Sequence, residues 1–243
     1  MRKISSAGLQ ASPPIQRTTT GAGGRLHGRI YEAIQNRLLE GEYPAGTKLS
    51  VEAIRTEFGV SKQPVMEALR LLSADGLVEI LPQIGCVVTE YSLEEVEDFF
   101  RMFAGFESVI AAAAAQRRTD EHLDEIYLAA RRMDRLNTEP DPDIRARQYR
   151  VQNRNFHEII HRMAHSRVMS NMSRRMWDLS DFLINTTGAP HPVGSAIEER
   201  NEDHGRIVKA LENGDAEAAK IEMENHILST ATMLQATRTE AVS

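Results

Sequence analysis

Between Leu26 and Leu38 an apolar side chain stands at every fourth position, a spacing typical of one face of an amphipathic helix. The residues of this face are Leu26, Ile30, Ile34 and Leu38. Glycine and proline interrupt the pattern at Gly41, Pro44 and Gly46, where we expect the helix to end in a turn. The first ordered element is therefore predicted to begin near Leu26.

Two shorter helices and a hairpin are predicted next. One helix starts after Ser50 and ends at Gly59, where glycine suits a left-handed cap. A third helix begins at Ser61 and ends before Gly76. The segment LVEILPQIGCVVTEY then holds two β-branched runs around residues 82–85, the pattern of a hairpin. Three helices followed by a β-hairpin wing predict a winged helix-turn-helix.

The rest of the chain shows only helical patterns. Ser92 and Glu95 fit a capping box, so we place a domain boundary near residue 91. Six helices are predicted, over residues 93–117, 119–137, 143–164, 166–187, 195–212 and 215–236. The fold class is mainly α, a winged helix-turn-helix followed by an all-α six-helix bundle. The predicted divisions are an arm over 1–25, a DNA-binding domain over 26–91, a helical ligand-binding domain over 92–237, and a tail over 238–243.

Length and composition fit two globular domains. The chain has 243 residues, of which 41% are hydrophobic and 26% are charged. Its apolar runs fall short of the ~20 residues of a membrane span, and its start lacks a secretion signal, so we expect a cytoplasmic protein. Cys86 is the single cysteine, which excludes an internal disulfide and a thiolate metal cluster. A metal site would use histidine, asparagine and carboxylate ligands.

The charge distribution is uneven. The net charge is −6, which taken alone argues against binding to nucleic acid. Residues 1–29 nevertheless hold no acidic residue and five basic ones, Arg2, Lys3, Arg17, Arg25 and Arg29. Residues 5–24 are rich in Ser, Thr, Pro and Gly, so we expect disorder there. The segment is either a tail of accidental composition or a basic arm that lies along a DNA groove.

The predicted second and third helices form the candidate DNA-reading element. Their turn would place Lys62 and Gln63 in the exposed first turn of the third helix, where both side-chain types can read base edges in a major groove. The free N–H groups of that turn, with the Ser61 hydroxyl, suit a phosphate. Arg70 would contact the DNA backbone or remain with the fold. An ordinary polar outer face would show the same pattern, so the residues alone leave both interpretations open.

Three of the eight histidines stand on predicted helices beside small or polar residues: His157, His204 and His226. A single helical histidine is more often structural than a ligand. Asn153 precedes His157 by one helical turn on the same face, which favours a shared site. Imidazoles with an oxygen donor suit zinc, nickel, manganese or iron. The residues leave a metal site and a structural role equally open.

A competing motif shares this helix. His157, Glu158 and His161 spell H-E-x-x-H, which in metalloproteases supplies two zinc ligands and a general base. The alternative function is therefore a metal-dependent hydrolase. The motif is short enough to occur by chance, and no strand pattern precedes it, so we favour the other histidine set.

Residues 26–90 resemble the winged helix of the GntR family of transcription regulators. The resemblance rests on EGEYPAGTKLS, FGVSKQPVMEALRLL, ADGLVEI and PQIGCVV, in the family's order and spacing. It implies DNA contacts by Arg25, Arg29, Ser61, Lys62, Gln63, Arg70 and the wing residues Gln83 and Gly85. Lys62 and Met66 stand where the family usually has arginines, and Ile84 stands at the wing tip where a basic residue is common. Between residues 30 and 91 nine acidic side chains outnumber five basic ones, a deficit that the basic arm would offset.

Residues 93–236 resemble the FCD ligand-binding domain of the FadR-type branch of that family, in its shorter, VanR-like form with six helices. The matching segments are FESVIAAAAAQRRT, NRNFHEII and DHGRIVKALENGDAEAAKIEMENHI. The resemblance implies a divalent metal ion on Asn153, His157, His204 and His226, with asparagine in place of the usual aspartate. It also points to an effector pocket near Arg101, Phe103 and Glu107, where Phe103 replaces a common arginine.

Together these observations predict a ligand-responsive transcriptional regulator rather than an enzyme. We expect a homodimer that binds double-stranded operator DNA, acts as a repressor, and responds to a small organic acid at the metal. The ligand would change the spacing of the two DNA-binding heads. A purely structural DNA-binding protein would instead show no small-molecule effect.

Overall fold

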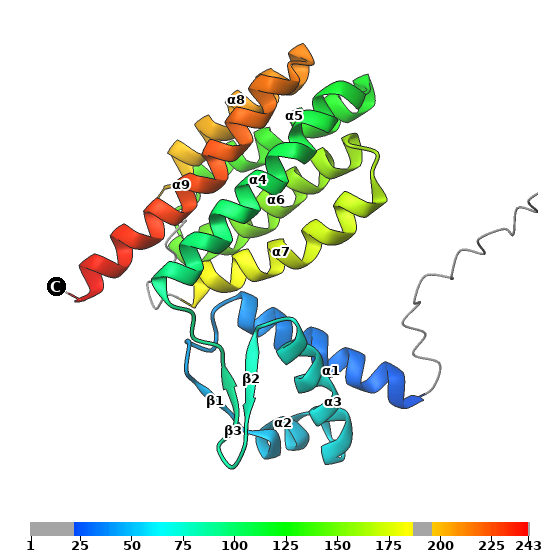
Figure 1. The fold of residues 1–243 in the computed structure, drawn as a ribbon, viewed down its shortest axis with the longest axis vertical. Coiled ribbons are helices and arrows are strands. Elements are labelled where there is room, and N and C mark those ends of the chain that lie inside the picture. Colours follow the sequence, from blue (N-terminus) through cyan, green and yellow to red (C-terminus); the bar gives the residue numbers. More distant parts are fainter. Residues whose placement is uncertain (1–21, 187–195, 243) are drawn as a thin grey trace, which may run out of the picture.

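The computed structural model describes residues 22–186 and 196–242, with side chains over 26–186 and 196–235. The small domain with the three-stranded sheet lies at one end, and a bundle of long helices lies at the other (Figure 1). This confirms the predicted fold class. The disorder predicted for residues 5–24 falls outside the described part up to residue 21. It is wrong for residues 22–24, which belong to a helix that begins at Ala22. Within that part no helix has the length and apolar character to cross a membrane.

The first domain is a winged helix-turn-helix. Its helices are α1 (Ala22–Leu39), α2 (Val51–Phe58) and α3 (Lys62–Ala74), and its strands are β1 (Lys48–Leu49), β2 (Val78–Leu81) and β3 (Gly85–Val88). The apolar face of α1 packs against α3, and Ile30, Leu38 and Leu69 have no exposed surface. The periodicity of α1 therefore forms the core of this domain.

Two features differ from the sequence prediction. The first helix begins at Ala22, four residues before the apolar pattern, because backbone hydrogen bonds can extend a helix through a turn that carries no apolar side chain. The wing hairpin also gains a third strand, since β1 pairs antiparallel with β3 in the order β1-β3-β2. Two residues are too few for a strand periodicity, so only the pairing of Leu49 with Cys86 identifies β1.

The turn between α2 and α3 depends on a glycine. Gly59 ends α2 with φ 62° and ψ 39°, a left-handed conformation that side chains with a Cβ adopt at a cost. The backbone N–H of Val60 donates to the carbonyl of Arg55, which closes the end of the helix. This turn sets the direction in which α3 leaves, with Ser61 at its N-cap.

The second domain contains six α-helices over the described residues, as predicted. They are α4 (Leu93–Arg117), α5 (Asp120–Asp134), α6 (Pro142–Met163), α7 (Arg167–Asn185), α8 (Ile197–Asn213) and α9 (Ala216–Val242), with the 3-10 turn η1 (Arg135–Thr138) after α5. Helices α4 and α9 lie side by side along most of their length (Figure 1). Because α9 continues to Val242, residues 238–242 belong to this helix and do not form the separate tail that was expected.

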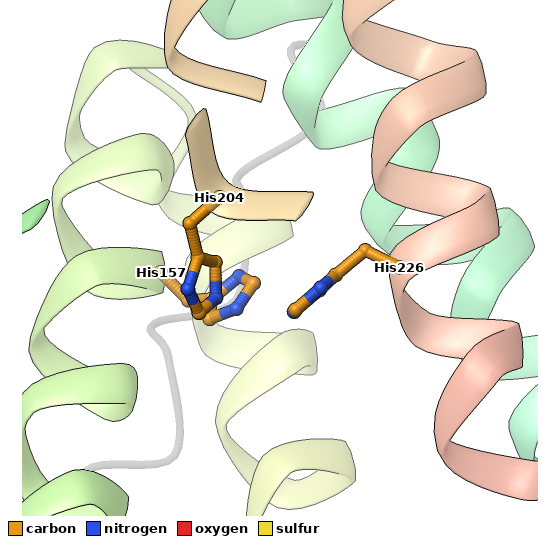
Figure 2. Close-up of side chains that lie close together, drawn as sticks. All are labelled: His157, His204 and His226. Carbon is orange, nitrogen blue, oxygen red and sulfur yellow. The ribbon is translucent and has the colours of Figure 1, made fainter. Parts of the chain in front are cut away.

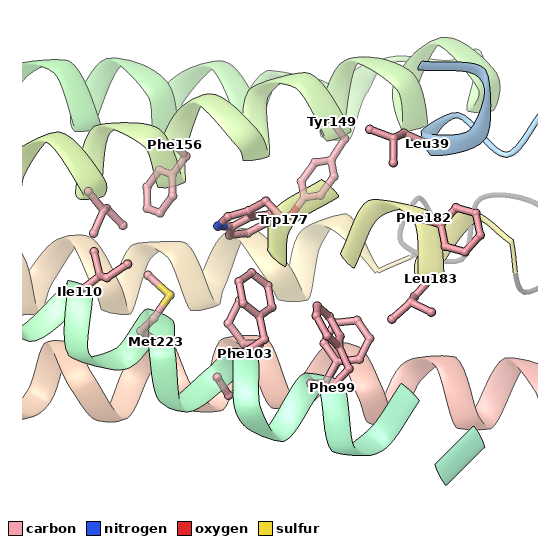
Figure 3. Close-up of a cluster of buried hydrophobic side chains, with 14 of the residues drawn as sticks. Leu39, Phe99, Phe103, Ile110, Tyr149, Phe156, Trp177, Phe182, Leu183 and Met223 are labelled. Carbon is pink, nitrogen blue, oxygen red and sulfur yellow. The ribbon is translucent and has the colours of Figure 1, made fainter. Parts of the chain in front are cut away.

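Aromatic side chains fill the middle of the helical domain (Figure 3). Phe103 is fully buried, with its ring centroid 5.5 Å from that of Phe99 and 5.0 Å from that of Trp177. Phe156 from α6 is also fully buried. These contacts join α4 to α7 and place Trp177 between the core and the site described below.

The two domains meet where α7 crosses the end of α1. The side-chain amide of Asn185 donates to the carbonyl of Leu39 at 2.7 Å, and Gln35 donates to Asp178 at 3.3 Å. Gly41 has φ +74°, and a Cβ there would lie 2.7 Å from the carbonyl oxygen of Asn185. Only glycine fits this close approach, so the junction is built into the turn after α1.

Two serine caps give a matched test of this local structure. Ser92 caps α4 in a full capping box with Glu95, whereas Ser61 at the start of α3 makes no side-chain cap bond. We expect Ser92→Ala to lower the free energy of unfolding by about 1 kcal/mol, and Ser61→Ala to lower it by only a few tenths. Urea denaturation followed by circular dichroism measures both. Equal losses would contradict the assignment of the caps.

Candidate functional site

The start of α3 presents the predicted DNA-reading residues to solvent. Ser61, Lys62 and Gln63 are exposed, and the amide of Gln63 donates to Glu67 one turn later at 3.1 Å. Because the Ser61 side chain makes no cap bond, the first N–H groups of α3 remain available to an anion. Arg70 is exposed two turns further along.

The wing and the first helix hold the other predicted DNA contacts. Gln83 and Gly85 lie exposed at the tip between β2 and β3, with φ of 65° and 109°. Arg29 is exposed on α1, and Arg25 belongs to the same helix, although its side chain lies outside the described part. The predicted DNA residues with described side chains are therefore all at the surface, and their contact with DNA stays a prediction.

The three predicted histidines converge in the helical domain. His157 comes from α6, His204 from α8 and His226 from α9, and one ring nitrogen of each lies within 4.8 Å of the others. Figure 2 shows the three rings pointing toward one another. All three side chains are at most 1% exposed. The sequence pattern thus identified a real cluster across three helices.

The environment keeps these imidazoles uncharged. Burial, followed by the neighbouring histidines and Arg200, holds the pKa of His157 well below its ordinary value. Burial and the same cationic neighbour lower the pKa of His204 and His226 in the same direction. A neutral imidazole has a free nitrogen lone pair, which is the form that binds a metal ion.

Several buried polar atoms of the cluster and of the neighbouring Asn153 side chain have no hydrogen-bond partner among the described residues. They are both ring nitrogens of His157, both ring nitrogens of His204, and the amide oxygen of Asn153. Leaving a buried polar atom unpaired costs about 1–3 kcal/mol. The unpaired nitrogens of two adjacent imidazole rings therefore indicate a missing ligand. Asn153 precedes His157 by one turn of α6, which supports the expected donor set. The residues therefore fit a divalent metal ion.

His226 has partners that the sequence analysis missed. Its Nδ1 lies 3.2 Å from Asp203 Oδ2, and Arg200 donates to its Nε2 at 3.0 Å. A carboxylate on one ring nitrogen orients the other toward a metal, so Asp203 suits a supporting role. A metal on Nε2 would take the place of the bond from Arg200. Arg200 precedes His204 by four residues, a spacing that sequence analysis could have used.

The H-E-x-x-H motif does not form a second cluster of free ligands. His161 Nε2 lies 2.8 Å from Glu107 Oε2, and Ser173 donates to the other oxygen of that carboxylate. Glu158 is exposed, whereas His157 joins His204 and His226. His161 is thus held by a buried polar contact and lies outside the three-histidine cluster.

The expected effector-pocket residues lie elsewhere. Arg101 is a surface side chain, 65% exposed, and pairs with Glu97 and Asp98. This placement contradicts the expectation that Arg101 lines the pocket, because a residue two positions before Phe103 faces the opposite side of the helix. Phe103 is core, and Glu107 belongs to the contact with His161.

A cavity of about 410 Å³ lies beside the histidines instead. Its wall includes Asn153, Trp177 and Arg200, and the Trp177 ring centroid lies 4.3 Å from that of His157. The other polar residues of its wall include Arg147, Arg150, Ser180, Asp181, Thr230, Glu40 and Glu42. They come from separate segments of the chain, so no local motif could have identified them as a group.

Family profiles match both parts of the chain. Residues 26–88 match the profile described as "Bacterial regulatory proteins, gntR family", and residues 98–229 match the FCD domain. The second match alone covers more than half of the chain, and the two follow the division between the winged helix and the helical domain.

Relatives and solved structures extend this likeness over most of the chain. The uncharacterized HTH-type transcriptional regulator YdhC of Bacillus subtilis is 24% identical over 83% of this chain and 85% of its own length. The HTH-type transcriptional repressor GlaR of Escherichia coli is 22% identical over 84% and 94%. Escherichia coli McbR/YncC has the same fold, with a TM-score of 0.71 at 18% identity over 87% of this chain and 97% of that chain.

A pair of variants tests which histidines bind a metal ion. We expect His204→Ala to weaken zinc binding by more than about tenfold, because a ligand is lost. His161→Gln keeps a donor for Glu107 and should bind zinc as the unmodified protein does. Titration with zinc in a competing chelator measures both. If His161→Gln loses zinc while His204→Ala keeps it, the three-histidine assignment is wrong and the H-E-x-x-H alternative gains support.

Proposed function

Because this chain belongs to the GntR family of bacterial regulatory proteins and carries an FCD domain, we propose that it is a repressor released from operator DNA by an organic acid. Its relatives are transcriptional regulators and not enzymes. The observation that carries the ligand response is the buried three-histidine cluster beside a cavity. The protein would act on DNA in the cytoplasm.

DNA reading is assigned to the start of α3. Lys62 and Gln63 are exposed on a helix whose first turn has no side-chain cap, so they can meet base edges while the N–H groups bind a phosphate. The wing tip at Gln83 and Gly85 would lie along the adjacent backbone. The basic residues Arg2, Lys3 and Arg17 would supply the positive charge that the winged helix itself lacks.

The proposed assembly is a homodimer. Operators read by winged helices commonly contain two half-sites, which a two-fold symmetric protein matches. Met102 and Val109 stand two turns apart on α4, with 61% and 50% of their surface exposed. Such apolar residues on one helix face support a partner surface in the helical domain.

The effector site is assigned to the cavity and to the three-histidine cluster, which contacts its wall residues Trp177 and Arg200. His157, His204 and His226, with the oxygen of Asn153, would hold zinc, nickel, manganese or iron. A bound divalent ion attracts a carboxylate and would so supply the acid-binding group of the site. Trp177 would pack against the carbon chain of the acid, and Ser180 and Thr230 would donate hydrogen bonds. The acid can act as an inducer only if it binds the released arrangement more tightly than the DNA-bound one.

The DNA assignment is tested with one charge. Lys62→Ala should weaken binding to duplexes selected from a random pool by about 10- to 100-fold, the loss of a contact with a base edge or phosphate. The matched control is Lys209→Ala, which removes the same charge from α8, where the lysine pairs with Glu212. Fluorescence anisotropy at fixed salt measures both. Equal affinity of Lys62→Ala and the unmodified protein would refute the assignment.

A further inference from the structure

The cavity beside the histidines is not confined to the helical domain. Its wall includes Glu40 and Glu42, which follow the last residue of α1 in the winged helix. Its wall also includes Arg200, whose guanidinium donates to His226 at 3.0 Å. The space is therefore lined both by a direct neighbour of the three-histidine cluster and by residues at the junction between the domains.

One cation of the wall contacts both domains. Arg150 of α6 donates to Glu40 at 2.8 Å, whereas its other nitrogen lies 3.9 Å from Asp181. Asp181 already accepts a bond from Arg154 at 2.6 Å. Glu40 is therefore the main partner of Arg150. The pair is partly exposed, 24% for Arg150 and 39% for Glu40, so water and other anions can compete for it.

Arg150 also lies in line with the metal-binding face of α6. Arg150, Asn153 and His157 follow one another at intervals of three and four residues, which places them on one side of the helix. The seven residues from Arg150 to His157 span about 10 Å along the helix. The long Arg150 side chain and a small ligand together can bridge that distance. A molecule that binds at the histidines would direct its far end toward Arg150.

We propose that Arg150 is a second anion-binding group of the effector site, in addition to the metal ion. A dicarboxylate effector would replace Glu40 as the partner of Arg150 and so loosen the contact between the winged helix and the helical domain. This inference rests on the proposed function and adds the chemical class of the ligand and the means of its action. One carboxylate would occupy the histidine end, and the other would replace the carboxylate of Glu40 on the Arg150 guanidinium.

The position of Glu40 explains how its release would reach the DNA. It directly follows α1, and α1 packs along α3. Other junction contacts, among them those from Asn185 to Leu39, from Gln35 to Asp178 and from Arg175 to Asp75, do not involve Arg150. They keep the winged helix attached, so losing the Glu40 contact changes its freedom to rotate without separating the domains.

Trp177 provides the first readout, because it is the single tryptophan and lines the cavity. The probes are succinate, glutarate and adipate, each compared with the monocarboxylate of the same length, by fluorescence titration of the zinc-loaded protein. At least one diacid should bind about tenfold more tightly than its monoacid. Glu40→Gln should tighten that binding about two- to fivefold by removing the competitor. Arg150→Gln should weaken it about tenfold or more.

The control is Glu32→Gln, which removes the same charge from an exposed position of α1 two turns before Glu40. It should leave the affinity for the diacid unchanged. If Glu40→Gln binds no more tightly than Glu32→Gln, the competition does not exist. If no diacid binds more tightly than its monoacid, Arg150 is not an anion site. Either result overturns this proposal, while DNA and zinc binding would still test the proposed function separately.

Amide hydrogen exchange gives the second readout. The N–H groups of Gly41 and Glu42 donate to the carbonyls of Leu38 and Arg37 at 3.1 and 2.9 Å. The diacid should speed exchange at these amides in the unmodified protein, and its monoacid should not. In Arg150→Gln exchange should be fast from the start and unchanged by the diacid. If the diacid leaves the exchange rates of these amides unaltered in the unmodified protein, the proposed link between the effector site and the winged helix is contradicted.

Discussion

The helical domain is organised around three uncharged imidazoles that meet in its interior. Burying polar nitrogens without hydrogen-bond partners is costly. The four ring nitrogens of His157 and His204 are buried and have no partner among the described residues. A divalent metal ion at this point would take up the lone pair of one nitrogen in each ring and so offset part of that cost. Since the three rings come from α6, α8 and α9, a metal ion there would also fix the relative positions of these helices.

The same arrangement connects the proposed ligand site to the winged helix. Helix α6 carries His157 at the cluster and Arg150 at the domain junction, and α7 carries Trp177 at the cavity and Asn185 at the junction. A shift of these helices on binding of the proposed ligand would therefore act at both ends. Gly41 lets the chain of the winged helix approach α7 closely, which makes the junction sensitive to small displacements.

Sequence analysis predicted what depends on local periodicity. The apolar face of α1, the left-handed Gly59 and the capping box that starts α4 at Leu93 all follow from the spacing of a few neighbouring residues. The three histidines were identified with the help of the family resemblance, and the structure brings them together. The start of α1 and strand β1 were missed, because neither has a periodic apolar pattern. The predicted position of Arg101 was wrong by about half a helical turn. The contact between Arg150 and Glu40 has no local sequence pattern, because it joins positions 110 residues apart.

The most direct test of this account is X-ray absorption spectroscopy of the zinc-loaded protein. Three histidine ligands predict a spectrum with three imidazole nitrogens at about 2.0–2.1 Å from the metal, completed by oxygen donors. The multiple-scattering signal of the imidazole rings gives their number. A spectrum with fewer than three imidazoles would show that the buried cluster is not the metal site, and the proposed effector response would lose its basis.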